Sequence, residues 1–232
     1  MDRSVIMSIM KTTAIILAGG KGSRFKGKEP KQFLKIGTRT MLDMCLQPFQ
    51  KNKGVQGIIL VCPKEHLAQA KKIAGYYSKV AVVVAGGKTR QGSSANGVAA
   101  AGEAGQILIH DAARALVPND VIDRVLKALS KNAAVMPVLP AEDTTVRVDD
   151  KGNVTAVLDR DKLRRVQTPQ GFRADIIRIA HRLAQDEGFA DAPDDCSLIL
   201  RYGLAPIASV TGDAQNIKIT YPSDLEIASA LI

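Results

Sequence analysis

The chain has 232 residues, 46% of them hydrophobic and only 4% aromatic, and its 32 basic and 23 acidic residues give a formal net charge of +9. This length allows one large α/β domain or two small ones, and folding buries roughly 70–75% of the unfolded chain's surface, so no disulfide or metal staple is required. The positive charge suits an anionic partner, which includes both small phosphorylated molecules and nucleic acids.

The cysteines and the N-terminal segment narrow the class of protein further. Cys45, Cys62 and Cys196 are odd in number, far apart and outside any C-x-x-C spacing, so we expect reduced thiols in a cytoplasmic protein. The first eleven residues carry an apolar run too short for a signal peptide or a membrane span. We therefore expect a disordered tail at residues 1–11, a single domain at residues 12–232, and no membrane partner.

Apolar runs alternate with helical patterns along the chain, which is typical of a parallel sheet whose strands are connected by helices. We expect strands at residues 13–18, 56–62, 80–85, 106–110, 133–139, 206–210 and 217–220. Helical patterns occupy residues 41–51, 63–76, 89–101, 118–130, 174–185, 194–201 and a final stretch from Pro222. The predicted fold class is α/β, a Rossmann-like and mostly parallel sheet flanked by helices.

The alternation of strands and helices is interrupted at residues 141–165, which we call the arm. Residues 144–148 and 154–158 alternate as two short strands around a polar turn sequence, DDKGN, that is typical of a hairpin. A hairpin inserted in an α/β domain has unpaired edges and little core of its own. It is either a solvent-exposed flap or a dimerisation arm, and we favour an arm that forms a homodimer.

The richest stretch for chemistry is AIILAGGKGSRFKGKEPKQFLK at residues 14–35. An apolar strand leads into Gly19, Gly20 and Gly22, which let backbone N–H groups surround an anion. Lysines and one arginine then supply the charge that a polyphosphate needs. The loop is neither a dinucleotide fingerprint, because Phe25 stands where the third glycine belongs, nor a Walker loop, because it lacks the hydroxyl that would hold Mg²⁺. The alternative is a solvated basic loop.

Two further motifs follow predicted strands. GGKTR at residues 86–90, with Ser93 downstream, offers backbone N–H groups and a hydroxyl for a base or a phosphate, although an ordinary strand-to-helix turn is the alternative. In HDAAR at residues 110–114, Asp111 ends a strand, and a carboxylate that faces a triphosphate suits Mg²⁺. The alternative for Asp111 is a helix cap.

Two cations elsewhere also have a functional and a structural interpretation. Lys218 lies in an otherwise apolar stretch, NIKIT, where a lysine rarely occurs without an anionic partner. The alternative is a surface lysine whose ammonium reaches solvent. Arg160 follows Asp159 at the end of the second arm strand, and a structural salt bridge is the alternative there.

Taken together, these motifs resemble one family. The set LAGGKGSR, PKQ, GG-x-x-R-x-x-S, HDAAR, DT at 143–144, DR at 159–160, TPQ at 168–170 and NIK is similar to the 2-C-methyl-D-erythritol 4-phosphate cytidylyltransferases and covers nearly the whole chain from Thr13. The chain departs from the family pattern at Ala115, where proline is frequent. It departs again at Pro193-Asp194-Asp195, where the family usually shows T-D-E.

The resemblance implies a transfer of CMP from CTP to methylerythritol phosphate in non-mevalonate isoprenoid biosynthesis, with Mg²⁺ as the cofactor. It implies catalytic roles for four cations, which are Arg24, Lys31, Arg160 and Lys218, and a metal ligand in Asp111. The residues implied for nucleotide binding are Ala18, Gly19, Gly20, Gly22, Gly87, Ser93 and Ala112. Those implied for the polyol phosphate are Arg114, Thr144 and Thr168. Thr144 and Arg160 are expected to reach across a dimer into the neighbour's site.

Three alternatives to this function are open to test. The first is a cytidylyltransferase for another polyol phosphate, such as ribitol 5-phosphate. A basic nucleic-acid-binding protein is the second, which we disfavour because the cations cluster in a glycine loop and aromatic residues for base stacking are scarce. A catalytically inactive regulator is the third, disfavoured because the expected cations and Asp111 are all present.

Overall fold

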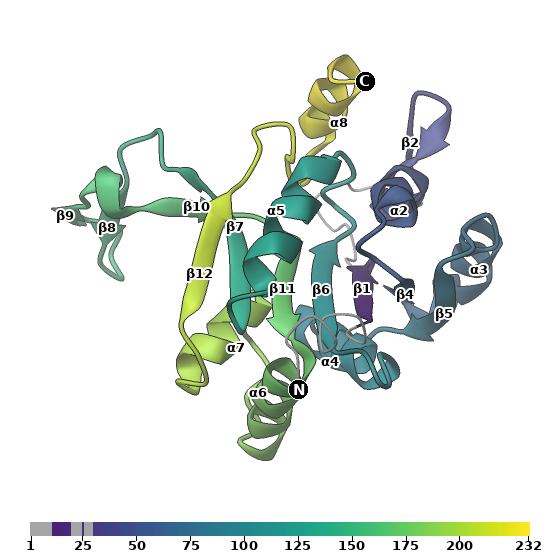
Figure 1. Cartoon of the computed structure of the whole chain (residues 1–232). Helices are drawn as coiled ribbons and strands as arrows, with labels where there is room; N and C mark the ends of the chain where they lie inside the picture. The colour runs from purple at the N-terminus through teal and green to yellow at the C-terminus, as the bar shows by residue number, and fades with distance from the viewer. Residues whose placement is uncertain (1–10, 20–24, 26–29) are drawn as a thin grey trace.

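The computed structural model describes residues 11–19, 25 and 30–232, and an eight-stranded sheet runs through this part of the chain (Figure 1). Its strands are β1 (Thr12–Leu17), β4 (Gly57–Cys62), β5 (Val80–Ala85), β6 (Gln106–Asp111), β7 (Ala134–Pro140), β10 (Arg164–Val166), β11 (Gln170–Arg173) and β12 (Ile207–Thr211). Their order is β10-β7-β11-β6-β1-β4-β5, and β12 pairs with β7. Strands β6, β1, β4 and β5 pair in parallel, as do β7 and β12, whereas β10 and β11 are antiparallel to their neighbours. The predicted α/β fold with a mostly parallel sheet is confirmed.

Helices cover both faces of this sheet, as Figure 1 shows. One face packs against α2 (Met41–Lys51), α3 (Leu67–Ala74) and α5 (Asn119–Leu129). The other face packs against α4 (Arg90–Ala100), α6 (Ala174–Asp186) and α7 (Asp195–Arg201). The last helix, α8 (Pro222–Ala230), contacts a small ribbon of β2 (Lys35–Ile36) and β3 (Arg39–Thr40). The described part of the chain also contains the short 3₁₀ segments η2 (Lys31–Phe33), η3 (Lys64–His66) and η4 (Arg160–Lys162).

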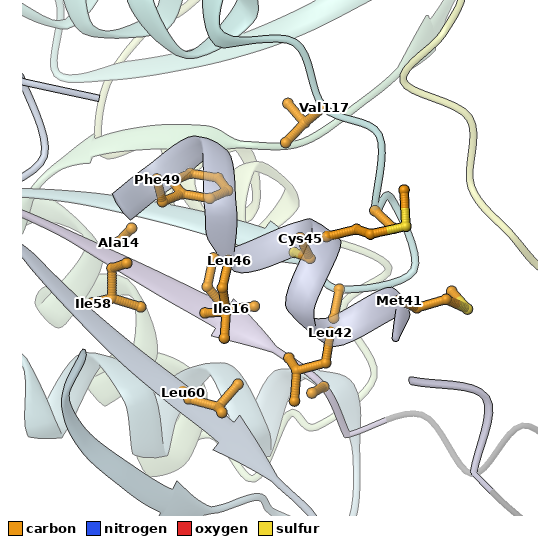
Figure 2. Close-up of a cluster of buried hydrophobic side chains, with 14 of the residues drawn as sticks. Ala14, Ile16, Met41, Leu42, Cys45, Leu46, Phe49, Ile58, Leu60 and Val117 are labelled. Atoms are coloured by element: carbon orange, nitrogen blue, oxygen red, sulfur yellow. The ribbon is translucent and has the colours of Figure 1, made fainter. Parts of the chain in front are cut away.

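Helix α2 shows how the core holds the sheet in place (Figure 2). Its apolar residues recur at the spacing of one helical face, and Leu42, Leu46 and Phe49 are completely buried. They pack in one cluster with Ile16 of β1 and with residues of β4. The Thr40 side chain accepts a hydrogen bond from the backbone N–H of Asp43 and so caps the helix at its predicted start. This packing fixes the carboxyl end of β1, next to Ala18 and Gly19.

Helix α4 approaches the sheet closely on the other face because it carries a glycine where the two surfaces meet. A Cβ atom added at Gly97 would lie 2.4 Å from Cγ2 of Ile15 and 3.1 Å from Cγ2 of Val61. Any larger residue would have to push the helix away from β1 and β4. The N-terminal turn of α4 is thereby held at the carboxyl edge of the sheet.

The structure differs from the sequence-based prediction at three places. Residues 217–220, predicted as a strand, form no strand, because separate contacts replace a continuous ladder there: the carbonyl of Ile219 accepts from Lys31, and its N–H donates to the carbonyl of Ala113. Residues 170–173 form strand β11, which the sequence pattern did not indicate. The helix predicted at 63–76 begins as η3 and ends as α3 at Ala74.

The arm contains the predicted hairpin. Strands β8 (Val146–Val148) and β9 (Val154–Val157) form a separate two-stranded sheet that projects from the body beyond β10 (Figure 1). The Asp149 carboxylate accepts hydrogen bonds from two backbone N–H groups of the turn, and Gly152 adopts a φ of 85°. The role of this hairpin as a dimerisation arm stays a prediction.

Three further expectations concern the ends and the compartment of the chain. Residues 1–10 of the predicted tail lie outside the described residues, whereas the carbonyl of Lys11 accepts hydrogen bonds from Gly105 and Gln106. All three cysteines are free and buried, in accord with the predicted reduced thiols. In the described part of the chain, no helix is both long and apolar enough to span a bilayer.

Candidate active site

A cavity of about 240 Å³ opens at the carboxyl edge of the sheet, where β1 and β6 end. This is the edge at which open parallel sheets bind ligands. The cavity brings together seven of the residues predicted from the sequence, which are Ala18, Gly19, Lys31, Ser93, Asp111, Ala112 and Lys218. Its lining also includes five residues without a predicted role, which are Leu17, Gln32, Met41, Arg90 and Ala113.

Asp111 is the electrostatic centre of this cavity. Its Oδ1 accepts a hydrogen bond from Nε of Arg90 at 3.0 Å, and its Oδ2 accepts one from Nζ of Lys218 at 2.8 Å. Burial alone would raise the pKa of the Asp111 carboxyl, but the two neighbouring cations lower it well below its usual range. Asp111 is therefore a carboxylate, and it is the anionic partner that the sequence context of Lys218 predicted.

Lys31 and Lys218 are connected through the backbone. Lys31 lies on η2 and donates from Nζ to the carbonyl oxygen of Ile219 at 2.9 Å, one residue beyond Lys218. Both lysines line the same cavity although 187 positions separate them in the chain. Two cations beside one carboxylate give the cavity a positive charge suited to phosphate groups.

Ser93 lines the cavity from α4, and two glycines of the preceding turn pack closely around α4. Ser93 Oγ accepts a hydrogen bond from the backbone N–H of Gly87 at 3.1 Å and donates to the carbonyl of Thr89 at 2.9 Å. A Cβ atom at Gly86 would lie 2.9 Å from this hydroxyl, and one at Gly87 would lie 2.7 Å from backbone carbon of Gly92. Gly86 and Gly87 therefore let the turn before α4 pack closely on Ser93 and Gly92. Gly87, predicted to bind the nucleotide, is absent from the described lining of the cavity.

His110 and Thr168, which are buried, and the half-buried Arg114 are hydrogen-bonded next to Asp111. The Thr168 hydroxyl accepts the backbone N–H of Asp111 at 3.1 Å, so its own proton is directed to Nδ1 of His110 at 3.0 Å. The opposite nitrogen, Nε2, then donates to the carbonyl of Arg114 at 3.1 Å. Burial lowers the pKa of His110 to about 4, so the ring is neutral at pH 7. These hydrogen bonds orient the strand end that carries Asp111.

The remaining predicted site residues are distributed as follows. Arg114 donates from its two terminal nitrogens to the carbonyls of Asn216 and Val166, which ties three segments together. Thr144 and Arg160 lie on the exposed arm and are absent from the described lining of the cavity. Three residues of the glycine loop, Gly20, Gly22 and Arg24, lie outside the described residues.

Arg90 is the site residue whose importance the sequence reasoning missed. Besides contacting Asp111, it donates from Nη1 to Oδ2 of Asp195 at 2.8 Å. Asp195 is almost fully buried, and its Oδ1 accepts a hydrogen bond from the hydroxyl of Ser94 at 2.5 Å and contacts Nε2 of His181 at 3.2 Å. The motif GG-x-x-R-x-x-S contained the signal, since it places an arginine one helical turn before the cavity serine.

Comparison with known proteins decides the family. Residues 12–232 match the family described as 2-C-methyl-D-erythritol 4-phosphate cytidylyltransferase (IspD). The chain belongs to this family. A protein of that name from Thermobifida fusca is 40% identical over 232 residues, which cover 96% of this chain and 93% of the relative. The family resemblance found in the motifs is thereby confirmed.

Solved structures related to this family have the same fold. The 4-diphosphocytidyl-2C-methyl-D-erythritol synthase from Anaerococcus prevotii matches with a TM-score of 0.84 at 28% identity and covers 96% of this chain and 98% of that one. The 2-C-methyl-D-erythritol 4-phosphate cytidylyltransferase from Thermus thermophilus matches with a TM-score of 0.77 at 34% identity, over 96% and 98% of the two chains.

The departure from the family pattern at Pro193-Asp194-Asp195 has a clear structural use in this family member. Asp194 caps α7 by accepting the backbone N–H of Ser197 at 2.8 Å, and it also accepts from Nε2 of Gln170 at 3.0 Å. Asp195 pairs with Arg90. The two carboxylates therefore connect the TPQ segment and α7 to the cavity, and the proline introduces no hydroxyl at this position.

Proposed function

We propose that this chain transfers the CMP group of CTP to 2-C-methyl-D-erythritol 4-phosphate and releases pyrophosphate, a step of non-mevalonate isoprenoid biosynthesis. Family membership supports the reaction class. The observation that carries the proposal is a single cavity lined by Lys31, Asp111 and Lys218 next to the backbone of Gly19 and the hydroxyl of Ser93. It combines charge for a triphosphate with small residues and a hydroxyl, at Ala18, Gly19 and Ser93, that suit a nucleoside.

The chemistry requires no general base from the protein. An oxygen of the acceptor phosphate attacks the α-phosphorus of CTP, the bond from this phosphorus to the bridging oxygen breaks, and pyrophosphate leaves. A phosphate dianion is a nucleophile at pH 7 without further activation. We assign Lys218 and Lys31, with Arg24 of the glycine loop, to neutralising the crowded phosphorus and the leaving group. The neutral His110 points to Thr168 and the backbone, which agrees with a structural role.

We propose Asp111 as the ligand of Mg²⁺. Among the described residues, no three His, Cys, Asp or Glu side chains are grouped to hold a metal by themselves. Mg²⁺ is commonly bound by one or two carboxylates together with phosphate oxygens. A single charged carboxylate in the cavity therefore fits an ion that arrives with the nucleotide. Bound there, Mg²⁺ would neutralise charge on the phosphates.

We also propose that the chain is a homodimer formed through the arm. Four valines of the hairpin are exposed on the single chain, which are Val146, Val148, Val154 and Val157. Thr144 and Arg160 lie on the same arm, so a two-fold arrangement offers them a place at the neighbour's cavity. The free, buried thiols support a cytoplasmic location for this dimer.

The function is tested by measuring pyrophosphate release over a matrix of nucleotides and acceptors with MgCl₂ present. We expect release with CTP and 2-C-methyl-D-erythritol 4-phosphate and little with ATP, GTP or UTP. Turnover with ribitol 5-phosphate far above that with methylerythritol phosphate would overturn the acceptor assignment. Tight binding of random DNA with a steep salt dependence would instead favour a nucleic-acid-binding protein.

A further inference from the structure

Arg90 lies between two buried carboxylates, one in the cavity and one behind it. Its Nε contacts Oδ1 of Asp111 at 3.0 Å, and its Nη1 contacts Oδ2 of Asp195 at 2.8 Å. The side chain of Asp195 is only 1% exposed. The planar guanidinium is fixed at two of its nitrogens, so its orientation is determined from both sides.

The anchor on the far side is itself held firmly. Asp195 is the first residue of α7, and its Oδ1 is occupied by the Ser94 hydroxyl and lies within 3.2 Å of His181 Nε2. Ser94 belongs to α4, as Arg90 does, and His181 belongs to α6. Residues of three helices therefore meet at the carboxylate of Asp195. Its second oxygen, Oδ2, accepts the hydrogen bond from Arg90.

Lys218 contacts the same cavity carboxylate in a different way. Its side chain is 48% exposed, against 24% for Arg90, and it extends from a segment without regular secondary structure to Oδ2 of Asp111. An ammonium on a flexible stem exchanges partners more readily than a guanidinium fixed at both ends. The two oxygens of Asp111 thus have one fixed and one exchangeable cation.

We propose that Arg90 is a positioning residue for Asp111: anchored by Asp195, it keeps hold of Oδ1 while Lys218 leaves Oδ2 for the phosphates of CTP and Mg²⁺ takes Oδ2. Arg90 and Lys218 between them occupy both oxygens of Asp111 in the structure. Departure of Lys218 exposes one carboxylate oxygen, which suits a divalent cation. This inference rests on the proposed function, because it assumes that CTP enters this cavity together with Mg²⁺.

The test is calorimetric binding of CTP, without any acceptor, over a series of MgCl₂ concentrations. Asp195→Asn and Arg90→Gln should each raise the MgCl₂ concentration for half-maximal CTP binding by about 10-fold or more, the usual result of removing a partner of a metal ligand. The double variant should be no worse than either single variant, because both break one chain of contacts.

The two substitutions change the net charge in opposite directions, which separates positioning from general electrostatics. By charge alone, Asp195→Asn would weaken the binding of a cation and Arg90→Gln would strengthen it, so a higher MgCl₂ requirement in both variants would be due to positioning. Arg201→Gln is a control matched to Arg90→Gln. Arg201 lies at the end of α7 and is also paired with a carboxylate, that of Glu187. The control should leave the MgCl₂ requirement unchanged.

Folding is followed by thermal melting of each variant, and Arg90→Lys serves if Arg90→Gln does not fold. Lysine keeps the charge but cannot bridge both carboxylates, so it should also raise the MgCl₂ requirement. Melting shifts without any change in this requirement would show a merely structural role and overturn the inference, as would wild-type CTP binding that does not depend on MgCl₂. If the variants behave as expected but the wild type releases no pyrophosphate, the proposed function fails while the positioning role stands.

Discussion

The carboxyl edge of the sheet and the arm depart from ordinary protein surfaces in opposite ways. At the sheet edge, Asp111 and Asp195 are buried charges, each paired with a cation. On the arm, Val154 and Val157 are 61% and 70% exposed apolar side chains. Buried charged groups and exposed apolar side chains are both unusual in a folded protein, so each region is a candidate for binding a partner. The groups at the sheet edge suit the polyphosphate that we propose, and the valines of the arm suit the second chain that we propose.

The largest effect should follow from removing a cation at the sheet edge. We expect Lys218→Ala and Lys31→Ala each to lower kcat by about 10²–10³-fold, equivalent to about 2.7–4 kcal/mol, as for the loss of one group that stabilises charge in the transition state. Steady-state kinetics measure the loss, which should fall on kcat more than on KM. Lys72→Ala, an exposed lysine on α3, is the charge-matched control. Near-wild-type kcat in either variant would mean that the active site lies elsewhere.

The sheet edge should also make stability depend on pH. The pKa of His110 is lowered to about 4 by burial, below its value of about 6.5 in an unfolded chain. Between these two values the unfolded state binds more protons than the folded state, so stability falls as the pH is lowered from 6.5 to 4, by about 3 kcal/mol. The depressed pKa of Asp111 adds a further loss only at lower pH, below its unfolded value near 3.9.

Urea unfolding at pH 7.0, 5.5 and 4.5 measures this dependence. His110→Gln should remove most of the slope between pH 6.5 and 4.5, whatever it does to stability at pH 7. His66→Gln is the control, because His66 lies on η3 at the surface side of the fold. An equal slope in wild type and His110→Gln would mean that other groups cause the dependence.

A smaller effect should appear at the arm. Val157→Thr keeps the shape of the side chain and replaces a methyl group by a hydroxyl, once in each chain of a two-fold dimer. Losing about 0.8 kcal/mol for each buried methyl group twice corresponds to about a tenfold rise in the dimer dissociation constant. Sedimentation across a concentration series measures it. The same variant should change the unfolding free energy of an isolated subunit by less than about 0.5 kcal/mol, because Val157 is exposed there.

A wild-type protein that is monomeric at micromolar concentration would contradict the proposal that the arm forms a dimer. Of the two regions compared, the sheet edge would then remain as a candidate binding site. A Val157→Thr dimer as tight as the wild type would place the interface on another surface.

The smallest expected effect comes from an experiment that tests whether the arm of one chain contributes to the cavity of the other. Inactive Arg160→Ala mixed with inactive Lys31→Ala should recover about a quarter of wild-type activity, because half of the dimers are mixed and each of these has one intact site. Mass spectrometry must first show that the subunits have exchanged. No recovery after complete exchange would mean that Arg160 acts in its own chain, whatever the arm contributes to assembly.

Hydrophobic spacing and helix caps in the sequence were enough to predict much of the fold. Helix α2 has the predicted bounds because Thr40 supplies a cap and Leu42, Leu46 and Phe49 share a face. Strand β11 was missed because its four residues show no strand-like alternation, and its place between β6 and β7 is set by tertiary contacts. The strand predicted at 217–220 was wrong because an apolar run does not reveal that the side chain of Lys31 takes the carbonyl of Ile219.

The site could be predicted only in part from the sequence, because some of its contacts also join distant parts of the chain. Motifs identified Lys31, Asp111 and Lys218, which the structure brings into one cavity. The pairing of Arg90 with Asp195 joins residues 105 positions apart, and a single sequence contains no signal for such a contact. The roles proposed for Thr144 and Arg160 depend on a second chain, so neither the sequence pattern nor one folded subunit tests them.

Gly97 sets how closely α4 packs on the sheet, and so affects where the active-site residues of this helix lie. The helix rests on Ile15 and Val61 at this point, while Arg90 and Ser93 lie two turns or less away at its other end. A methyl group added at Gly97 would push α4 away from Ile15 and Val61 and would displace Arg90 and Ser93 together. The methyl group itself would contact neither the cavity nor a charged group. The geometry of this side of the cavity is therefore set in part from the interior of the protein, by how closely one helix is allowed to lie on the sheet.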